Sequence, residues 1–274
     1  MVRIVVDSSA DLRPRIRERV SVVPLTVHFG KEEYVDGVDL SPAAFYKKLA
    51  ICKELPTTSQ AAPYGFSEVF EPLVEAGNQV VAIVVSSSLS GTCQSATIAA
   101  ADYPGQVFVV DSRSIAIGAG ILAEYALELA DKGFSAGEIV TELEAAKEKI
   151  RLFAVVDTLE YLQRGGRVSK TVAIAGGMLS VKPLITIENG SIILAGKARG
   201  NRQANALMDE KVRTLGVDWD KPCMLGYTGT GDELLAKYRA QSDIWTGDMY
   251  GSIVSGVVGT HVGPGAVAVA FFAK

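Results

Sequence analysis

A run of hydroxyl side chains follows one of the most apolar stretches of the chain. The apolar residues 80–85 stop at Ser86, and residues 86–92 read SSSLSGT before a helical pattern begins. A strand, a hydroxyl-rich loop and a helix in this order form the usual layout of an anion site, because loop amides and the helix dipole both favour negative charge. Hydroxyls in place of lysines suit one small anionic group better than a triphosphate. The competing interpretation is that Ser88 or Ser90 only caps the following helix.

Histidine is the scarcest chemically versatile residue here, since the chain holds only His28 and His261. His28 lies in an alternating apolar pattern that predicts a strand and a packing or surface role. His261 lies in residues 259–265, GTHVGPG, where three glycines and a proline predict a shaped loop whose backbone can approach a ligand. We therefore expect a functional role for His261. Residues 57–60, TTSQ, form a second hydroxyl cluster in a predicted loop, and these hydroxyls either line a site or cap the next helix.

Two pairs of arginines flank glycines in the second half of the chain. Arg164 and Arg167 lie in RGGR, and Arg199 and Arg202 lie in RGNR. Such pairs are commonly solvated surface, but two guanidinium groups can also receive a phosphate or an acidic partner through forked hydrogen bonds.

Two further chemistries stay open as alternatives. Ser90 and His261 would form the nucleophile and base of an esterase or acyl transferase if a carboxylate, for which Asp7 or Asp111 is available, oriented the imidazole. The run from Gly226 to Gly231, GYTGTG, precedes a helical pattern and would bind a phosphate ligand, although it lacks dinucleotide spacing. The sequence contains neither a GxSxG elbow nor a Walker loop.

The first half of the chain alternates apolar strand patterns with helical ones. Strands are predicted at residues 2–6, 22–29, 80–85 and 107–110, and helices at 41–53, 64–76, 114–132 and 135–150. Continuous Val and Ile strands between helices predict a parallel sheet covered on both faces, which is an α/β/α arrangement. Three of these strands end in Asp or Ser, at residues 7–8, 86–87 and 111–112. Ligands bind beyond the carboxyl ends of parallel strands, so we expect a polar site at this edge.

The second half of the chain has a different pattern. Residues 184–195 predict a hairpin with Asn189 and Gly190 in a type I′ turn, and further strands are predicted at 152–156, 223–227, 249–254 and 266–272. With helices at 204–215 and 233–241, this predicts an α/β fold with a mixed, largely antiparallel sheet and helices on one face. We place the boundary near residue 150, which gives domains 1–150 and 151–274.

Composition excludes several classes of function. The net charge is −4 and no basic tract occurs, which argues against nucleic acid and against anionic membrane surfaces. No apolar run is long enough to span a bilayer, and the start, MVRIVVDSS, predicts a strand in place of a signal peptide. Three scattered cysteines and two histidines predict neither disulfides nor a metal site, so we expect a cytoplasmic protein without a metal cofactor.

Taken together, these segments resemble the DegV family, the fatty-acid-binding subunits of bacterial fatty acid kinase. The matching segments occur in order over nearly the whole chain: residues 5–12, 23–25, 34–39, 56–60, 86–92, 110–112, 159–168, 182–184, 197–202 and 260–266. Each segment alone is a weak signal, whereas the ordered set is specific.

The resemblance implies a DegV-like fold with a fatty acid held in the cleft between the two domains. It places Thr58 and Ser90 on the acyl carboxylate and His261 beside it. It makes Ser59, Gly91, Thr92 and Gly263 supporting loop residues. It associates Arg167 and Arg199 with the head group or with docking of the kinase. Room for the tail is expected beside the small residues of segments 117–121 and 174–177, unless these mark close helix packing.

The function that the resemblance implies is that of a lipid carrier without catalytic residues of its own. The ligand would be a long-chain fatty acid, and no cofactor would be needed. A separate ATP-dependent kinase would transfer phosphate to the presented carboxylate and give an acyl phosphate.

Overall fold

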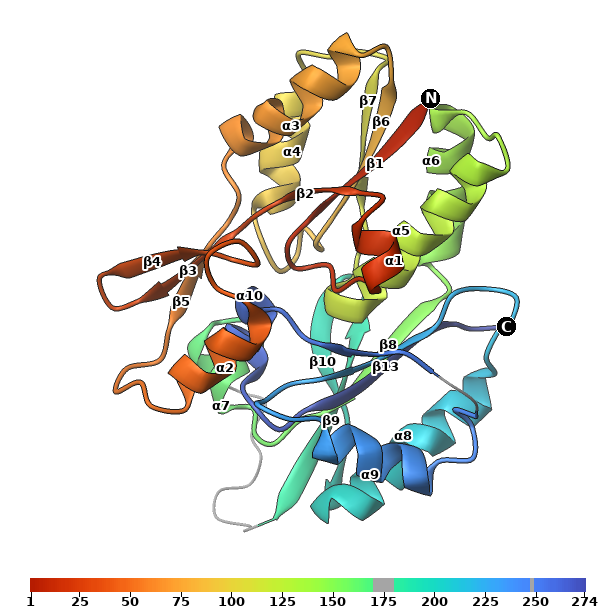
Figure 1. Cartoon of the computed structure of the whole chain (residues 1–274). Coiled ribbons are helices and arrows are strands. Elements are labelled where there is room, and N and C mark those ends of the chain that lie inside the picture. The colour runs from red at the N-terminus through yellow and green to blue at the C-terminus, as the bar shows by residue number, and fades with distance from the viewer. Residues whose placement is uncertain (170–179, 247–248) are drawn as a thin grey trace.

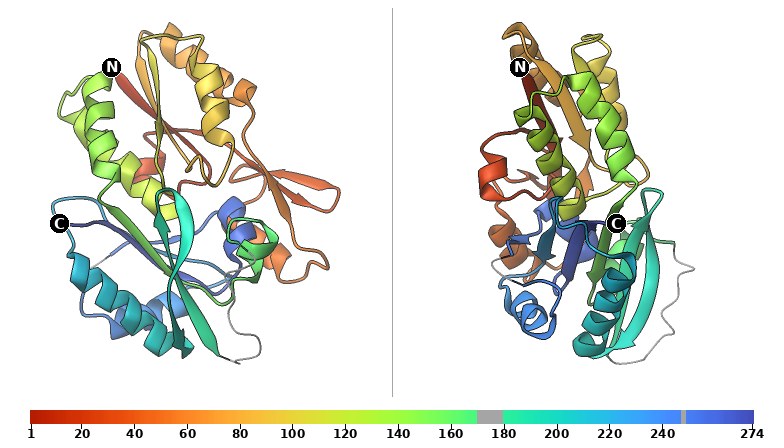
Figure 2. Two further views of the ribbon diagram at one scale, coloured as in Figure 1. Left: turned by 180° about the vertical axis from the view of Figure 1, so that it is seen from behind. Right: turned by 90° about the vertical axis from the view of Figure 1, so that its right-hand side faces the viewer.

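The computed structural model describes residues 1–169, 180–246 and 249–274 (Figure 1). Two main sheets lie one above the other, and α5 (Ala116–Asp131) packs between them (Figure 2). No helix in the described part of the chain is long and apolar enough to cross a membrane.

The first sheet has four parallel strands, in the order β2 (Ser21–Val23), β1 (Val2–Asp7), β6 (Gln79–Val84) and β7 (Val107–Asp111). Alternate residues of β1 and β6 point to opposite faces of this sheet and pack into two different apolar cores. Val5 packs with Phe66 and Phe70, whereas Ile4 packs on the side of α5. Helices α3 (Pro63–Glu75) and α4 (Thr92–Ala100) cover one face, and α5 and α6 (Ala136–Lys147) cover the other (Figure 1). The short α1 (Pro14–Arg17) follows β1. The predicted parallel sheet with two covered faces is confirmed.

The second sheet has six strands, in the order β10 (Ser191–Arg199), β9 (Val181–Glu188), β8 (Ile150–Val155), β13 (Val267–Phe272), β11 (Met224–Tyr227) and β12 (Gly251–Ile253). Of these neighbours, β11 and β12 pair in parallel and the others are antiparallel. Helices α8 (Gly200–Leu215) and α9 (Glu233–Gln241) cover one face, and α5 packs on the other, where Tyr125 meets Phe272 edge-on at 5.7 Å. The predicted mixed, largely antiparallel sheet is confirmed.

A third, three-stranded sheet was not predicted. Its order is β4 (Glu32–Val35), β3 (Thr26–Phe29) and β5 (Thr57–Ser59), and all its pairs are antiparallel. The single strand predicted at residues 22–29 is wrong, because Pro24 has no amide proton to continue the ladder and separates β2 from β3. The loop predicted at 56–60 contains β5, which pairs with β3. Helix α2 (Pro42–Leu49) follows β4 and ends four residues earlier than predicted.

The segment around His261 is also different from its prediction. Most of the expected loop is helical, since α10 (Gly256–Val262) includes His261 and ends before Gly263, whose φ is +77°. Glycine normally disfavours a helix, but here it permits close packing. A Cβ atom on Gly259 would lie 2.6 Å from the Tyr46 hydroxyl and 2.7 Å from the Phe45 ring of α2. Tertiary packing therefore stabilises α10 in spite of its weak local preference.

Candidate functional site

One cavity of about 350 Å³ lies where β5, the SSSLSGT loop and α10 meet. This volume is within the range of about 300–1,000 Å³ that is typical of small-molecule sites. Apolar side chains from both halves of the chain form most of its wall, among them Leu25, Leu89, Ile115, Leu162, Ile192 and Val258. The polar lining gathers around Thr58, Ser90, Arg167 and His261. Ser59, Gln60 and Gly91 of the same lining are exposed, so the polar end of the cavity reaches the surface.

Thr58 and His261 form a direct pair across this polar end. The Oγ1 atom of Thr58 lies 2.8 Å from Nε2 of His261. Burial, with the nearby charge of Arg167, lowers the pKa of His261 to about 4, so the imidazole is neutral at pH 7. Its Nδ1 atom is buried and has no partner among the described residues, which favours the tautomer with its proton on Nε2. Nε2–H then donates to Thr58, whose own hydroxyl proton is left to donate to an anion.

Ser90 lies at the start of α4, close to residues 58–60. Its Oγ atom lies 2.9 Å from Oγ1 of Thr92, and the Thr92 amide also donates to it at 3.3 Å. The neighbouring Gly91 lets the two hydroxyl segments meet, because a Cβ atom there would overlap the Gln60 side chain. The side-chain amide of Gln60 in turn donates from Nε2 to the Ser95 hydroxyl of α4 at 3.1 Å.

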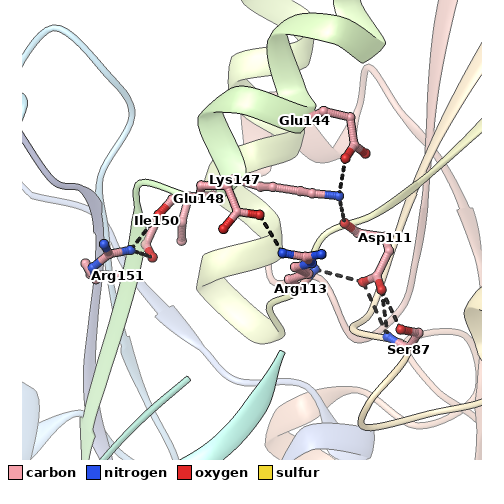
Figure 3. A network of polar contacts seen from close by, with 8 residues as sticks. All are labelled: Ser87, Asp111, Arg113, Glu144, Lys147, Glu148, Ile150 and Arg151. Atoms are coloured by element: carbon pink, nitrogen blue, oxygen red, sulfur yellow. Dashed lines mark hydrogen bonds and ion pairs between the residues drawn. The ribbon is translucent and has the colours of Figure 1, made fainter. Parts of the chain in front are cut away.

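Polar residues at the strand ends hold this loop from outside the cavity lining. Asp111 at the end of β7 accepts hydrogen bonds from the Ser87 amide at 3.3 Å and from the Ser87 hydroxyl at 2.5 Å (Figure 3). Arg113 follows Asp111 and pairs with Glu148 at 2.6 Å (Figure 3). The Ser86 hydroxyl donates to the Gly190 carbonyl at 2.8 Å. The predicted polar edge therefore acts mainly as a frame for the loop.

Asp7 joins the same frame from β1. Its carboxylate accepts from the Val85 amide at 2.6 Å and from the Ser9 amide at 2.9 Å, and burial raises its pKa. These bonds fix the end of β6, where the hydroxyl loop begins. The predicted type I′ turn is consistent with positive φ angles of 49° at Asn189 and 79° at Gly190, and this turn brings the β9–β10 hairpin against Ser86.

The other sequence-predicted residues divide into those at the cavity and those elsewhere. Ser59 reaches the lining, but its hydroxyl bonds to Nε2 of His28 at 2.8 Å. Gly263 closes α10 and leaves room for the Tyr161 ring. Arg167 lines the cavity and donates from Nε to the Leu89 carbonyl at 3.2 Å. Arg199 is exposed at the N-terminus of α8 and is not part of the lining.

A second, smaller cavity of about 40 Å³, lined mainly by apolar side chains, shares part of its wall with the first. Both are lined by Ile115, Ile192, Val258 and Val262. The expectation that residues 117–121 give room for a tail is not met, because neither lining includes them. A Cβ atom on Gly120 would overlap the Asp11 carbonyl, so this glycine serves close packing. The other expected segment, 174–177, lies outside the described residues.

Sequence reasoning missed Gly165, although its RGGR motif was noted. Its φ of −72° is allowed for any residue, but a Cβ atom would overlap Nδ1 of His261.

We expect Gly165→Ala to displace the imidazole from Thr58, raise the pKa of His261 towards its usual 6.5 and cost about 1–3 kcal/mol of stability. Histidine NMR titration and urea denaturation measure these effects. Gly137→Ala on α6 is the control, because nothing lies within 4 Å of its Cβ position. An unchanged His261 titration would contradict the expectation.

The two alternative chemistries find less support in this geometry. His261 faces Thr58, and Asp7 and Asp111 are bound to Ser9, Val85 and Ser87, so the described residues assemble no Ser–His–carboxylate array. In the GYTGTG run, Gly226 lies inside β11. A Cβ atom on Gly231 would lie 2.5 Å from the Glu233 carboxylate, whose charge repels a phosphate. Among the described residues, no group of three or more His, Cys, Asp or Glu side chains is placed to hold a metal ion.

Comparison with known proteins identifies relatives over the full length. The family described as "Uncharacterised protein, DegV family COG1307" matches residues 1–274. A DegV domain-containing protein of Caldanaerobacter subterraneus is 37% identical over 280 residues, covering 100% of this chain and 99% of the relative. A fatty-acid-binding DegV family protein from Thermus thermophilus superimposes with a TM-score of 0.88 at 31% identity, covering 100% and 99% of the two chains. A stearic-acid-binding protein from Eubacterium ventriosum superimposes with a TM-score of 0.87 at 27% identity, with the same coverage.

Proposed function

Because the chain belongs to the DegV family, we propose that it binds a long-chain fatty acid and presents the carboxylate to a separate kinase. The observation that carries this proposal is the chemical division of one cavity. Apolar side chains line the same cavity as Thr58, Ser90, His261 and Arg167. Thr58 contacts His261, and Arg167 donates to the Leu89 carbonyl beside Ser90. The fatty acids bound by the Thermus and Eubacterium relatives support the same ligand class for this chain.

The energetics of burial suit an acyl chain with an acidic head. Burying a tail contributes about 0.8 kcal/mol per methylene group. An unpaired buried carboxylate would cancel several kcal/mol of this gain, so the head needs donors. The hydroxyls of Thr58 and Ser90 supply them, at about 1.5–3 kcal/mol for each bond to a charged group. The neutral His261 acts through Thr58, and the Arg167 charge favours the anion.

The exposed rim of the polar end supports presentation to a partner. In the proposed reaction, a carboxylate oxygen attacks the γ-phosphorus of ATP on the kinase, and the bond between that phosphorus and the leaving ADP oxygen breaks. The products are an acyl phosphate and ADP. This chain binds and orients the carboxylate and contributes no catalytic residue, so we propose a carrier subunit in place of an enzyme.

Mass spectrometry of the protein as purified, without added ligand, tests the ligand class. We expect the native complex to exceed the mass of the chain by that of one long-chain fatty acid, and solvent extraction to release the acid. A delipidated sample should regain thermal stability on addition of palmitate. The absence of both a bound acid and any thermal shift with C14–C18 acids would overturn the proposal.

A further inference from the structure

Helices α8 and α9 lie side by side over one face of the second sheet (Figure 1), and a cleft of about 240 Å³ lies between them. Among the described residues, this cleft has no lining residue in common with the head-group cavity. The sheet and α9 supply its apolar lining, which consists of Val155, Leu234 and Val267. Four polar side chains complete it from the two facing helices: Asn201 and Asn205 of α8, and Lys237 and Gln241 of α9.

Asn205 is the buried member of this polar set, with an exposed fraction of 5%. Its Nδ2 atom donates to Oε1 of Gln241 at 3.2 Å, whereas its Oδ1 atom has no hydrogen-bond partner among the described residues. A carboxamide oxygen that is largely withdrawn from water costs free energy when it stays unpaired. Gln241 uses its acceptor on Asn205 and keeps donors on Nε2. The cleft therefore offers both an acceptor and donors to a polar group that enters it.

The chemistry of the lining suits a peptide segment that carries a negative charge. A peptide group has one N–H and one C=O, and carboxamide side chains match both. Lys237 adds a positive charge and forms no ion pair within the described part of the chain. Arg199 and Arg202 at the start of α8 are exposed and likewise have no ion pair there. The acids in the first turn of α9, Asp232 and Glu233, are not part of the lining.

The cleft also touches the segment that carries the head-group histidine. Gly265 lines the cleft and follows His261, which lines the cavity, by four residues. The amide of Gly265 donates to the Thr228 carbonyl at 3.0 Å, which fixes this segment to the end of β11. A protein segment held in the cleft is thus connected to the polar end of the cavity through a few residues of well-anchored chain.

We propose that the cleft between α8 and α9 binds an acidic peptide segment of a partner protein. The carboxamides of Asn201, Asn205 and Gln241 bind its peptide groups, and the Lys237 ammonium pairs with an aspartate or glutamate side chain. The exposed arginines at the start of α8 extend the same positive surface. That this partner is the kinase rests on the proposed function, whereas recognition of an acidic segment does not.

Titration of the whole protein with acetyl-triglutamate amide, followed by side-chain amide NMR, tests the cleft without any partner. We expect the resonances of Asn205 and Gln241 to shift, with a dissociation constant of about 1 mM. The corresponding glutamine peptide should bind about tenfold more weakly, because Lys237 loses its anionic partner. No shift up to about 10 mM triglutamate would overturn the proposal. Equal shifts with sodium acetate, which has no peptide group, would overturn the assignment to a peptide.

Lys237→Glu and Lys211→Glu form a matched pair of charge reversals. Both lysines lie on the helices that cover this face of the sheet, but Lys211 is not part of the cleft lining. We expect Lys237→Glu to weaken triglutamate binding at least about tenfold, and Lys211→Glu to change it less than about twofold. Equal weakening by both reversals would show a general attraction to positive surface and overturn the cleft as the site.

Asn201→Asp provides a second variant that is expected to fold normally. It keeps the side-chain shape and adds a negative charge in the first turn of α8, where the helix dipole favours it. In the cleft the same charge repels an acidic segment, so triglutamate binding should again fall about tenfold. Full binding by a stably folded Asn201→Asp would contradict the proposal.

Two further measurements separate this inference from the proposed function. Palmitate affinity of Lys237→Glu should lie within about twofold of wild type, because the cleft and the cavity have separate linings. The kinase catalytic subunit should bind this variant about tenfold more weakly, and triglutamate should compete with it. A wild type that binds triglutamate but no palmitate would contradict the proposed function alone. Triglutamate binding with unchanged kinase affinity in Lys237→Glu would overturn the kinase as the partner.

Discussion

Removing the hydroxyls of Thr58 and Ser90 together is expected to weaken palmitate binding about 100- to 10,000-fold. Each hydroxyl donates to the carboxylate in the proposed complex, and each such bond contributes about 1.5–3 kcal/mol. Thr58→Val keeps the branched shape that suits β5, and Ser90→Ala removes one atom from a partly exposed loop. Because Thr58→Val leaves the buried Nε2–H of His261 without its acceptor, we expect the free double variant to lose about 1–3 kcal/mol of stability. Affinity is therefore measured by calorimetry well below the melting temperature of the variant.

Ser59→Ala provides the matched control for the double variant. Ser59 is adjacent to Thr58 on β5 and lines the same cavity, but its hydroxyl bonds to His28. Its removal should change the affinity less than threefold, a difference of about 0.6 kcal/mol. Equal affinity of the double variant and the wild type would remove the head-group site. An equally large effect of Ser59→Ala would show that the loop, and not the two hydroxyls, determines binding.

The types of the site residues could be read from the sequence, but their supporting structure could not. Hydroxyl runs and an isolated histidine are visible because their composition differs from the apolar strands around them. Whether residues 57–59 form a strand depends on β3, which lies about 30 residues away in the chain. Likewise, α10 depends on the rings of Phe45 and Tyr46. Such long-range contacts override local preference and leave no periodic signal.

The group that each glycine lets approach could not be predicted from the sequence. Gly91, Gly120 and Gly165 all permit a close approach, but to three different groups: the Gln60 side chain, the Asp11 carbonyl and the His261 imidazole. A pattern of small residues predicts that another group approaches the backbone closely, but it does not predict whether that group is a ligand, a side chain or another backbone segment. For this reason segment 117–121 suggested space for a tail, although the structure fills that space with backbone. The apolar wall of the cavity instead comes from large side chains such as Leu162 and Ile192.

The charge states of the site residues could not be predicted from the sequence either, because they depend on burial and on neighbours that are distant in the chain. Histidine beside a carboxylate suggests a cation, because its usual pKa is close to neutral. Burial and Arg167 reverse this expectation for His261 and keep it neutral. The positive charge at the cavity therefore belongs to Arg167. The resemblance associates Arg167 and Arg199 alike with the head group or with docking of the kinase, but only Arg167 lines the cavity, so we expect the two arginines to have separable roles.

Arg167→Gln is expected to weaken palmitate binding about 10- to 100-fold, whereas Arg199→Gln should leave it within about twofold of wild type. Glutamine keeps a donor that can reach the Leu89 carbonyl, so the variant removes mainly the charge. The same charge lowers the pKa of His261, and its loss should raise the midpoint of the imidazole titration from about 4 towards 6.5. The folded state then loses less stability as the pH falls from 6.5 to 4, because its histidine accepts a proton more readily.

The Arg199→Gln variant, which is the control for Arg167→Gln, also tests the proposed kinase partner. With palmitate bound and ATP and the fatty acid kinase catalytic subunit added, hydroxamate trapping measures acyl phosphate. We expect Arg199→Gln to slow its formation although the carrier is fully loaded, because Arg199 is exposed outside the cavity lining, where an acidic surface of the proposed partner can reach it. Normal phosphate transfer with Arg199→Gln would contradict docking through this residue. Equal losses of palmitate affinity in both variants would show that the position of Arg167 in the cavity lining has no special consequence for the head group.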